Sequence, residues 1–203
     1  GVDNVRDLRE KALVAPIKSQ KKVYIIDEVH MLSKSAFNAL LKIIEEPPEH
    51  VVFILATTDF DKVPDTIVRR TQRYNFRLID ESTVADHLAF IAKKESIKID
   101  TDALHLIAER GGGSLRDSIS LLDQIQHSES KNGEITRSDI EASLGLATKD
   151  EINAIGEAIL SGDALKIITA VRQPELRGIG AVSVADQLYN WIQRNLESYP
   201  YLV

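Results

Sequence analysis

A short apolar run that ends in two carboxylates is the feature that most constrains how this chain folds. The run VYII covers residues 23–26 and leads directly into Asp27 and Glu28. A second apolar run, VVFILATT, covers residues 51–58. Runs of this length bounded by turn residues are typical of buried strands. A strand–helix–strand order with short loops predicts a parallel sheet, in which ligands bind at the carboxyl ends of the strands.

The segment between these two strands has the pattern of a helix. Ser33 is placed to cap it, and Phe37, Leu40, Leu41 and Ile44 recur at helical spacing. The sequence EEPP then ends it, because proline cannot continue a helix. We also expect a helix over residues 4–16, a strand at 51–58 that is buried on both faces, and a third strand at RYNFRL, residues 73–78.

Strand patterns disappear after residue 80, and helical patterns take their place. They cover residues 81–95, 101–110, 114–127 and 135–145, followed by a helical hairpin and a last helix that ends at residue 196. The predicted fold class is therefore α/β followed by all-α. We expect three parts: a strand–helix–strand block (1–79), a helical block (80–145) and a second helical block (146–203).

Composition excludes several classes of protein. The 203 residues contain no cysteine, so neither a disulfide framework nor a thiolate metal site can form. No apolar run approaches the ~20 residues that span a bilayer, and we expect a cytoplasmic protein without membrane contact. The net charge of −6 argues against a protein that coats nucleic acid through bulk positive charge. Any DNA contact must be confined to a patch or shared with partner subunits.

Asp27 and Glu28 have the chemistry of a phosphoryl-transfer site. An Asp at a strand end suits a hydrated Mg²⁺, which takes one or two carboxylates. The adjacent Glu can polarise water toward a terminal phosphate. Thr57 and Thr58 end the next strand and should reach the same sheet edge, where a hydroxyl could bind that phosphate. The alternative is that the carboxylates begin a solvated turn and the threonines are ordinary strand residues.

Arginines lie at two further places. RRTQR contains Arg69, Arg70 and Arg73, whose planar guanidinium groups suit phosphate; a solvated basic turn is the alternative. GGGSLRD puts Arg116 in the first turn of a helix, where the dipole disfavours a cation, so an anionic partner is more plausible there than capping. DEVH matches a helicase box, but four letters match often by chance, and we interpret His30 as a residue that packs or hydrogen-bonds locally.

The stretch VYIIDEVHMLSKSAFNALLKIIEEPPEHVVFILATTD, together with GSLRDSISLLDQ, strongly resembles the AAA+ clamp-loader ATPases, the gamma/tau subunits of bacterial DNA polymerase III. The resemblance covers residues 1–146 closely, and residues 147–203 fit the family's collar domain in helical pattern only. It implies a partial AAA+ parallel-sheet domain, a helical lid domain and the start of a helical collar.

The resemblance assigns roles residue by residue. Asp27 and Glu28 match the Walker B pair, with Asp27 on the Mg²⁺, and Thr58 matches the sensor 1 position. Arg116 matches the sensor 2 arginine of the lid. The family's Ser-Arg-Cys motif falls on Arg69, Arg70 and Thr71, which makes Arg70 the candidate arginine finger for a neighbouring subunit, although the serine and the cysteine are replaced.

One departure from the family is larger. The family begins with a P-loop, G-x-x-x-x-G-K-[ST], and a four-cysteine zinc module, and neither occurs in these 203 residues. Without the P-loop, phosphate binding loses its main contacts, so we expect no bound ATP or Mg²⁺ and no ATP hydrolysis by the isolated chain. The family's P-loop strand also separates the strands at 51–58 and 73–78. Without it we expect self-association, closure of the gap between these strands, or local disorder.

Three functions follow from this pattern. The first is a fragment or reduced relative of the ATPase subunit that loads the sliding clamp onto primed DNA, with the other clamp-loader subunits as partners. The second is a non-catalytic scaffold of the same ring, like the delta-prime subunit, that donates Arg70 to a neighbour. Retention of Asp27, Glu28 and Arg116 favours the first. The third, a helicase or branch-migration motor, is disfavoured by FNALLKIIEEPP.

Overall fold

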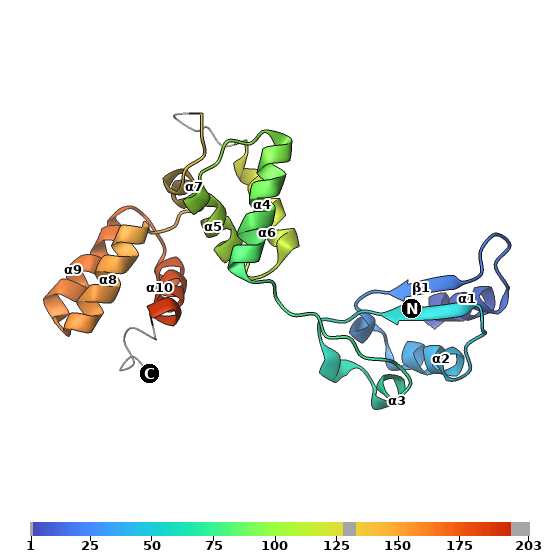
Figure 1. The fold of residues 1–203 in the computed structure, drawn as a ribbon. Helices are drawn as coiled ribbons and strands as arrows, with labels where there is room; N and C mark the ends of the chain where they lie inside the picture. The colour runs from blue at the N-terminus through green and yellow to red at the C-terminus, as the bar shows by residue number, and fades with distance from the viewer. Residues whose placement is uncertain (1, 128–132, 196–203) are drawn as a thin grey trace. The chain divides into compact units, whose positions relative to one another are not determined.

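The computed structural model describes residues 2–127 and 133–195 and divides the chain into two compact units (Figure 1). The first unit is Gly1–Phe76 and the second is Arg77–Val203. Each unit is described by itself below. The further boundary that we expect near residue 146 stays a prediction, and residues 196–203 of the predicted collar lie outside the described part.

The first unit combines helices with a parallel pair of strands. Its elements are α1 (Val2–Leu13), β1 (Lys22–Ile26), the 3₁₀ turn η1 (Val29–Met31), α2 (Lys34–Glu45), β2 (Val51–Leu55), η2 (Phe60–Lys62) and α3 (Asp65–Val68). β1 and β2 pair directly, with Lys22 opposite Val51 and Ile26 opposite Leu55. The predicted strand–helix–strand order and its parallel pairing are confirmed.

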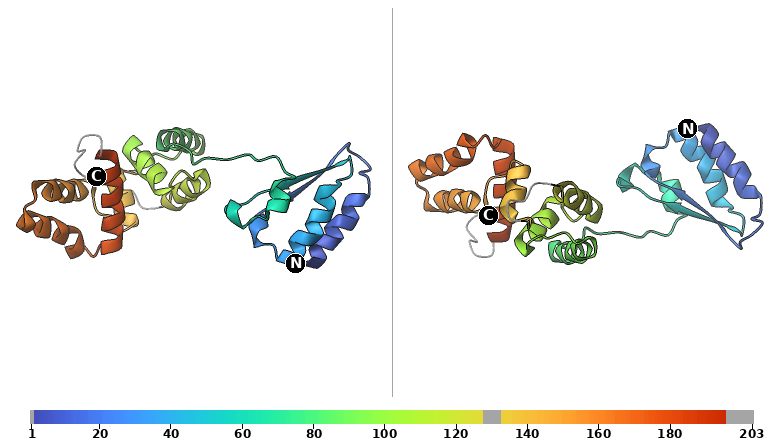
Figure 2. Two further views of the ribbon diagram at one scale, coloured as in Figure 1. Left: turned by 90° about the horizontal axis from the view of Figure 1, so that it is seen from below. Right: turned by 90° about the horizontal axis from the view of Figure 1, so that it is seen from above.

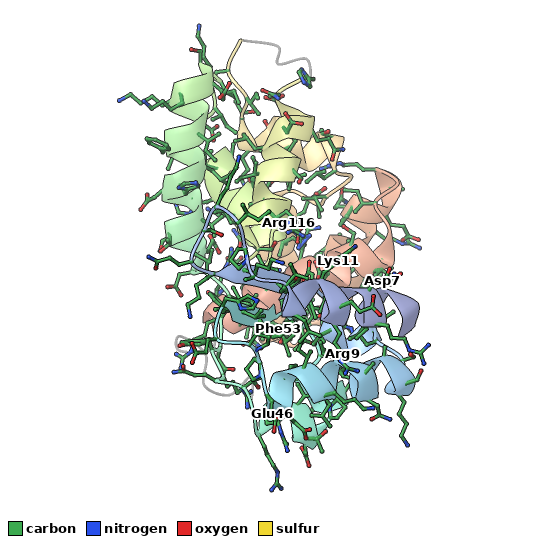
Figure 3. All side chains as sticks on the ribbon, turned by 90° about the vertical axis from the view of Figure 1, so that its right-hand side faces the viewer. Asp7, Arg9, Lys11, Glu46, Phe53 and Arg116 are labelled. Atoms are coloured by element: carbon green, nitrogen blue, oxygen red, sulfur yellow. The ribbon has the colours of Figure 1, made fainter. Side chains whose placement is uncertain are left out.

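Helix α2 forms where the sequence predicts it. The Ser33 hydroxyl accepts a hydrogen bond from the Ala36 N–H, which caps the first turn. Phe37, Leu40 and Ile44 are buried and form the main part of the core of this unit. Helix α1 completes this layer, and it turns Asp7, Arg9 and Lys11 to solvent (Figure 3).

One face of the sheet is exposed, and the expectation that the strand at 51–58 is buried on both faces is wrong. Helices α1 and α2 lie on the same side of the strands (Figure 2), where Tyr24 and Phe53 stack on each other. Side chains of a strand alternate between faces, so every second residue points away from these helices. The outward side chains are 42–68% exposed: Val23, Ile25, Val52 and Ile54.

The predicted third strand does not form. Residues 73–78 have no regular secondary structure, and Tyr74, Phe76 and Leu78 are 70%, 96% and 78% exposed. A strand needs a neighbour to pair its N–H and C=O groups, and β1 and β2 are the only strands of the described residues. The gap closure that we expected between residues 51–58 and 73–78 is therefore absent from this structure, and self-association stays a prediction.

The second unit is helical. Its elements are α4 (Glu81–Glu95), α5 (Thr101–Arg110), α6 (Leu115–Ile125), α7 (Arg137–Ser143), α8 (Lys149–Ser161), α9 (Ala164–Leu176) and α10 (Ala181–Asn195). All of these helices are predicted by the sequence to within a few residues. Helices α4–α7 share one apolar core around Leu88, Ile107, Leu122 and Ile140. Helices α8–α10 enclose a smaller one around Ile155 and Val184.

Two glycines permit close approaches in this unit. Gly113 has a φ of +81°, and a Cβ on it would lie 2.7 Å from the Cβ of Leu78. Because Gly113 has no Cβ, the segment before α4 can lie directly against the turn before α6. The Ile79 N–H donates a hydrogen bond to the Gly113 carbonyl there. Gly156 on α8 lies against the Trp191 ring of α10, where a Cβ would come within 2.6 Å. No helix in the described residues is both long and apolar enough to cross a bilayer.

Candidate functional site

The segments that follow β1 and β2 are held together by backbone hydrogen bonds. The Ala56 N–H donates to the Ile26 carbonyl at 2.9 Å, and the Val29 N–H donates to the Ala56 carbonyl at 2.9 Å. Val29 itself is buried. These bonds bring residues 27–30 and 56–59 side by side, and we call this pair of segments the carboxylate edge. Such an edge is where parallel sheets bind ligands.

Glu28 is the central residue of the carboxylate edge. Its backbone is left-handed, with φ 47° and ψ 48°, which costs a residue with a Cβ roughly 1–2 kcal/mol. Its carboxylate oxygen Oε2 accepts a hydrogen bond from Thr58 Oγ1 at 3.0 Å and a longer one from the Thr58 N–H at 3.4 Å. The structure therefore brings together two residues that the sequence places 30 positions apart and predicts at one edge.

His30 joins the same group. Its Nδ1 lies 2.8 Å from Thr57 Oγ1 and 3.2 Å from Glu28 Oε2, and its side chain is only 11% exposed. The interpretation of His30 as a locally hydrogen-bonded residue is confirmed. Its contact with Glu28 was missed by the sequence analysis. The sequence does hold a signal for this contact. His30 lies two residues after Glu28, and both follow a strand that is expected to end beside Thr57.

Asp27 offers the oxygen ligands that magnesium prefers. Its side chain is exposed, and its Oδ1 accepts a hydrogen bond from the Glu28 N–H at 3.0 Å. No group of three or more His, Asp or Glu in the described residues could enclose a metal ion. A single carboxylate fits Mg²⁺, which keeps several waters. Nearby, a hydrogen bond from Lys62 lowers the pKa of the Asp59 carboxyl below its usual range.

The predicted arginine finger, Arg70, is engaged within its own unit. Its Nη2 lies 2.9 Å from Glu45 Oε1, and its Nη1 donates to the Thr66 carbonyl at 3.0 Å. Both partners of the ion pair are about 40% exposed, at 39% and 41%, so the pair is held weakly. The Arg73 guanidinium lies over the Phe60 ring at 3.8 Å. The structure therefore shows Arg70 in an exposed ion pair, and it does not single out one arginine of this cluster as the finger.

Arg116 belongs to the second unit and is described apart from the carboxylate edge. It is the second residue of α6, after the N-cap Ser114, and its side chain is exposed (Figure 3). It forms no hydrogen bond or ion pair with a described residue. Its position in the first helical turn agrees with the sequence prediction. Its role as a sensor arginine stays a prediction, as do the roles assigned to Asp27, Glu28, Thr58 and Arg70.

The second unit has a cavity of about 350 Å³ between helices α4, α5, α8 and α10. Arg194 lies at its wall and pairs with Glu109 at 2.8 Å and Glu81 at 3.0 Å. Burial alone would lower the pKa of Arg194, but the hydrogen bond and charge of Glu109, together with Glu81, raise it overall. Trp191 donates to Asn153 at 2.8 Å. Because these polar groups satisfy each other, we assign no ligand to the cavity.

Comparisons with known families agree with the resemblance seen in the sequence. Residues 1–80 match the family described as "DNA polymerase III, delta subunit", and residues 83–129 match "DNA polymerase III clamp loader subunit, ATPase lid domain". DNA polymerase III subunit gamma/tau of Mycoplasma pneumoniae is 43% identical over 93% of this chain. DNA polymerase III subunit tau of Escherichia coli is 39% identical over 88% of it.

The chain spans about a quarter of the length of these relatives, 28% and 27% respectively. Among solved structures, the RuvB Holliday junction branch migration motor of Thermotoga maritima matches with a TM-score of 0.60. The match covers 78% of this chain and 55% of RuvB at 16% identity. An identity this low shows the fold alone. The predicted fold class, a partial AAA+ domain followed by helices, is confirmed, and the chain belongs to the DNA polymerase III gamma/tau clamp-loader family.

Proposed function

We propose that the carboxylate edge is the metal-and-water half of an ATP site in a clamp-loader subunit of the replicative DNA polymerase III. The observation that carries this proposal is the hydrogen bond between Thr58 and Glu28 across the ends of β1 and β2. It puts a hydroxyl donor beside a carboxylate next to Asp27, on a chain related to gamma/tau subunits. ATP binding and hydrolysis there would drive loading of the sliding clamp onto primed DNA.

The residues divide this work by their chemistry. Asp27 would hold Mg²⁺, which would supply charge for the phosphates, and Glu28 would polarise the water that attacks the terminal phosphate. Thr58 donates a hydrogen bond to that phosphate. Arg70 would leave its exposed pair with Glu45 to reach the nucleotide of a neighbouring subunit, and Arg116 is the proposed sensor arginine of the lid.

The phosphate half of the site is not among these 203 residues, because no Gly-rich loop ending in Lys occurs in them. The Asp27 side of the site fits Mg²⁺, but the residues present do not form a cradle for the phosphates. We therefore propose that the isolated chain does not hydrolyse ATP. Titration of the chain with ATP tests whether the phosphate cradle is missing, and micromolar binding would contradict its absence.

Partners and location follow from the same proposal. The other clamp-loader subunits, the sliding clamp and primed DNA are the expected partners, in the cytoplasm. A second candidate is a non-catalytic scaffold of the ring, favoured by the match of residues 1–80 to the family described as the delta subunit. In that case Arg70 would still serve a neighbour, but Glu28 would have no catalytic task.

The test uses a reconstituted clamp loader whose subunit carries these residues together with a phosphate-binding loop. DNA-stimulated ATP hydrolysis and clamp loading onto a primed circle are measured for wild type and for Arg70→Ala, with Arg69→Ala as the matched control. We expect Arg70→Ala to lower DNA-stimulated ATPase roughly 10³-fold and Arg69→Ala to change it little. Unchanged activity in Arg70→Ala would remove its role as a finger.

A further inference from the structure

Hydrogen positions at Thr57 determine which atom of His30 carries a proton. Thr57 Oγ1 has one hydrogen, which it donates to the Asp59 carbonyl at 3.0 Å. The same oxygen accepts a hydrogen bond from the Asp59 N–H at 3.1 Å. With that hydrogen on the Asp59 carbonyl, Thr57 Oγ1 can only accept at its 2.8 Å contact with His30 Nδ1, so we assign the hydrogen of this contact to the imidazole. In this assignment His30 is the Nδ1–H donor at the carboxylate edge.

This Nδ1–H faces two acceptors. Glu28 Oε2 lies 3.2 Å from the same nitrogen that donates to Thr57 Oγ1 at 2.8 Å. One N–H shared between two acceptors is common in proteins. The His30 side chain is 11% exposed, so it is held in place by packing as well as by Thr57, whereas the Glu28 side chain is 47% exposed. His30 is therefore the more buried partner of this pair and Glu28 the more exposed one.

Thr58 also has a single hydroxyl hydrogen, and in this structure it donates that hydrogen to Glu28 Oε2. A phosphate oxygen that takes this hydrogen removes the shorter of the two Thr58 hydrogen bonds to Glu28. The remaining donors to Oε2 are then the Thr58 N–H at 3.4 Å and His30 Nδ1 at 3.2 Å. Of these two donors, only His30 Nδ1 belongs to a side chain that also contacts a residue other than Glu28 and Thr58, namely Thr57.

We propose that His30 is a positioning residue, which holds the Glu28 carboxylate in place through Nδ1–H when the Thr58 hydroxyl turns to a phosphate. This inference rests on the proposed role of Glu28 in ATP hydrolysis. It assigns no contact with nucleotide to His30 itself. Loss of the histidine N–H lets Glu28 swing away from the attacking water, and misplacement of a catalytic group by about 1 Å costs up to roughly 100-fold in rate.

The first experiment tests the hydrogen bond on this chain without nucleotide. Long-range proton–nitrogen NMR spectra of ¹⁵N-histidine-labelled protein report which imidazole nitrogen carries the proton in the neutral ring. The His30 signal is assigned by its loss in His30→Asn among the five histidines of the chain. We expect the Nδ1–H form for His30. The Nε2–H form would overturn the proposal, whatever the protein's activity.

The second experiment separates positioning from packing. The amide nitrogen of asparagine lies where Nδ1 lies, whereas that of glutamine lies where Nε2 lies. In a reconstituted clamp loader whose subunit also carries a phosphate-binding loop, we expect His30→Asn to keep kcat within about twofold. We expect His30→Gln and His30→Ala to lower kcat roughly tenfold or more, with KM for ATP unchanged. Equal rates for the asparagine and glutamine variants would overturn the proposal.

Failure of the inference and failure of the proposed function have different signatures. A wild-type complex that loads no clamp and hydrolyses no ATP contradicts the proposed function, and the NMR measurement then still decides the His30 hydrogen bond. An active complex with an Nε2–H histidine contradicts the inference alone. Thermal unfolding of the three His30 variants is measured in parallel, and a rate loss in His30→Gln counts only where its unfolding temperature equals that of His30→Asn.

Discussion

The helices α4–α7 and the sheet of the first unit satisfy their backbone and their apolar side chains in different ways. In α4–α7 the hydrogen bonds are internal to each helix, and Leu88, Ile107 and Ile140 are fully buried. The strands β1 and β2 pair only with each other among the described residues, and Ile25 and Ile54 on their outer face are 68% and 47% exposed. A helix thus pairs its backbone groups within itself, whereas a strand needs a neighbouring strand to pair them.

The largest expected effect contrasts a buried with an exposed isoleucine. Ile107→Ala removes a side chain with 0% exposure from the core of α4–α7 and should destabilise the second unit by about 2–5 kcal/mol. Ile25→Ala, on the exposed sheet face, should change stability by less than about 1 kcal/mol. Urea unfolding followed by circular dichroism measures both. Equal costs would mean that the sheet face is covered in solution.

A glycine pair tests how the segment before α4 is held. Gly113→Ala should cost about 2–4 kcal/mol, because its φ is positive and its Cβ would lie 2.7 Å from Leu78. Gly112 also has a positive φ, but nothing lies within 4 Å of its Cβ position, so Gly112→Ala should cost only about 1–2 kcal/mol. The difference between the two unfolding free energies measures the close approach. No difference would show that this segment moves aside freely.

A smaller effect concerns the ion pairs between α10 and the helices α4 and α5. Arg194→Ala leaves Glu109, which is 11% exposed, without its closest cation and should cost about 1–2 kcal/mol. Arg172 on α9 is an exposed arginine, and Arg172→Ala should stay within about 0.5 kcal/mol of wild type. Thermal unfolding in low and high salt measures both. If high salt destabilises the wild type by as much as Arg194→Ala does, the loss of stability comes from the ion pairs. Equal losses of stability for Arg194→Ala and Arg172→Ala would exclude that origin.

The smallest expected effect on stability is that of a charge on the exposed face of the sheet, which tests whether this face pairs with another chain. Ile54→Lys puts a charge on the exposed sheet face and should change the unfolding free energy by less than about 0.5 kcal/mol. It should also lower self-association, because charge on an exposed apolar strand opposes pairing with another chain. Sedimentation velocity at several concentrations measures this. Wild-type protein that stays monomeric at every concentration would contradict the expected self-association.

The same contrast explains how much of the fold the sequence predicts. The helices from α4 to α10 follow from their apolar spacing and caps, because both are local properties; Thr148, for example, forms a complete capping box with Glu151. The strand expected at residues 73–78 fails, although Tyr74 and Phe76 favour strands, because pairing depends on a neighbour that local pattern does not reveal. The expectation that the strand at 51–58 is buried on both faces fails for the same reason, since Val52 and Ile54 are exposed.

The candidate site divides in a similar way. The meeting of Glu28 and Thr58 could be predicted, since parallel strands bring their carboxyl ends to one edge. The left-handed backbone of Glu28 and its contact with His30 could not, because a single non-glycine residue with positive φ leaves no mark in the sequence. Likewise, the pair of Arg70 with Glu45 joins the turn after α3 to the last residue of α2, 25 positions earlier, and nothing in the local pattern indicates it.

The claim that the carboxylate edge is half of an ATP site is tested most directly at Glu28. Single-turnover ATP hydrolysis is measured in a reconstituted clamp loader whose subunit carries these residues and a phosphate-binding loop. The control is Glu46→Gln, which removes the charge of another exposed glutamate of the first unit (Figure 3). We predict that Glu28→Gln lowers the rate of hydrolysis roughly 100-fold or more while Glu46→Gln keeps it. A Glu28→Gln complex that hydrolyses ATP at the wild-type rate would contradict the account.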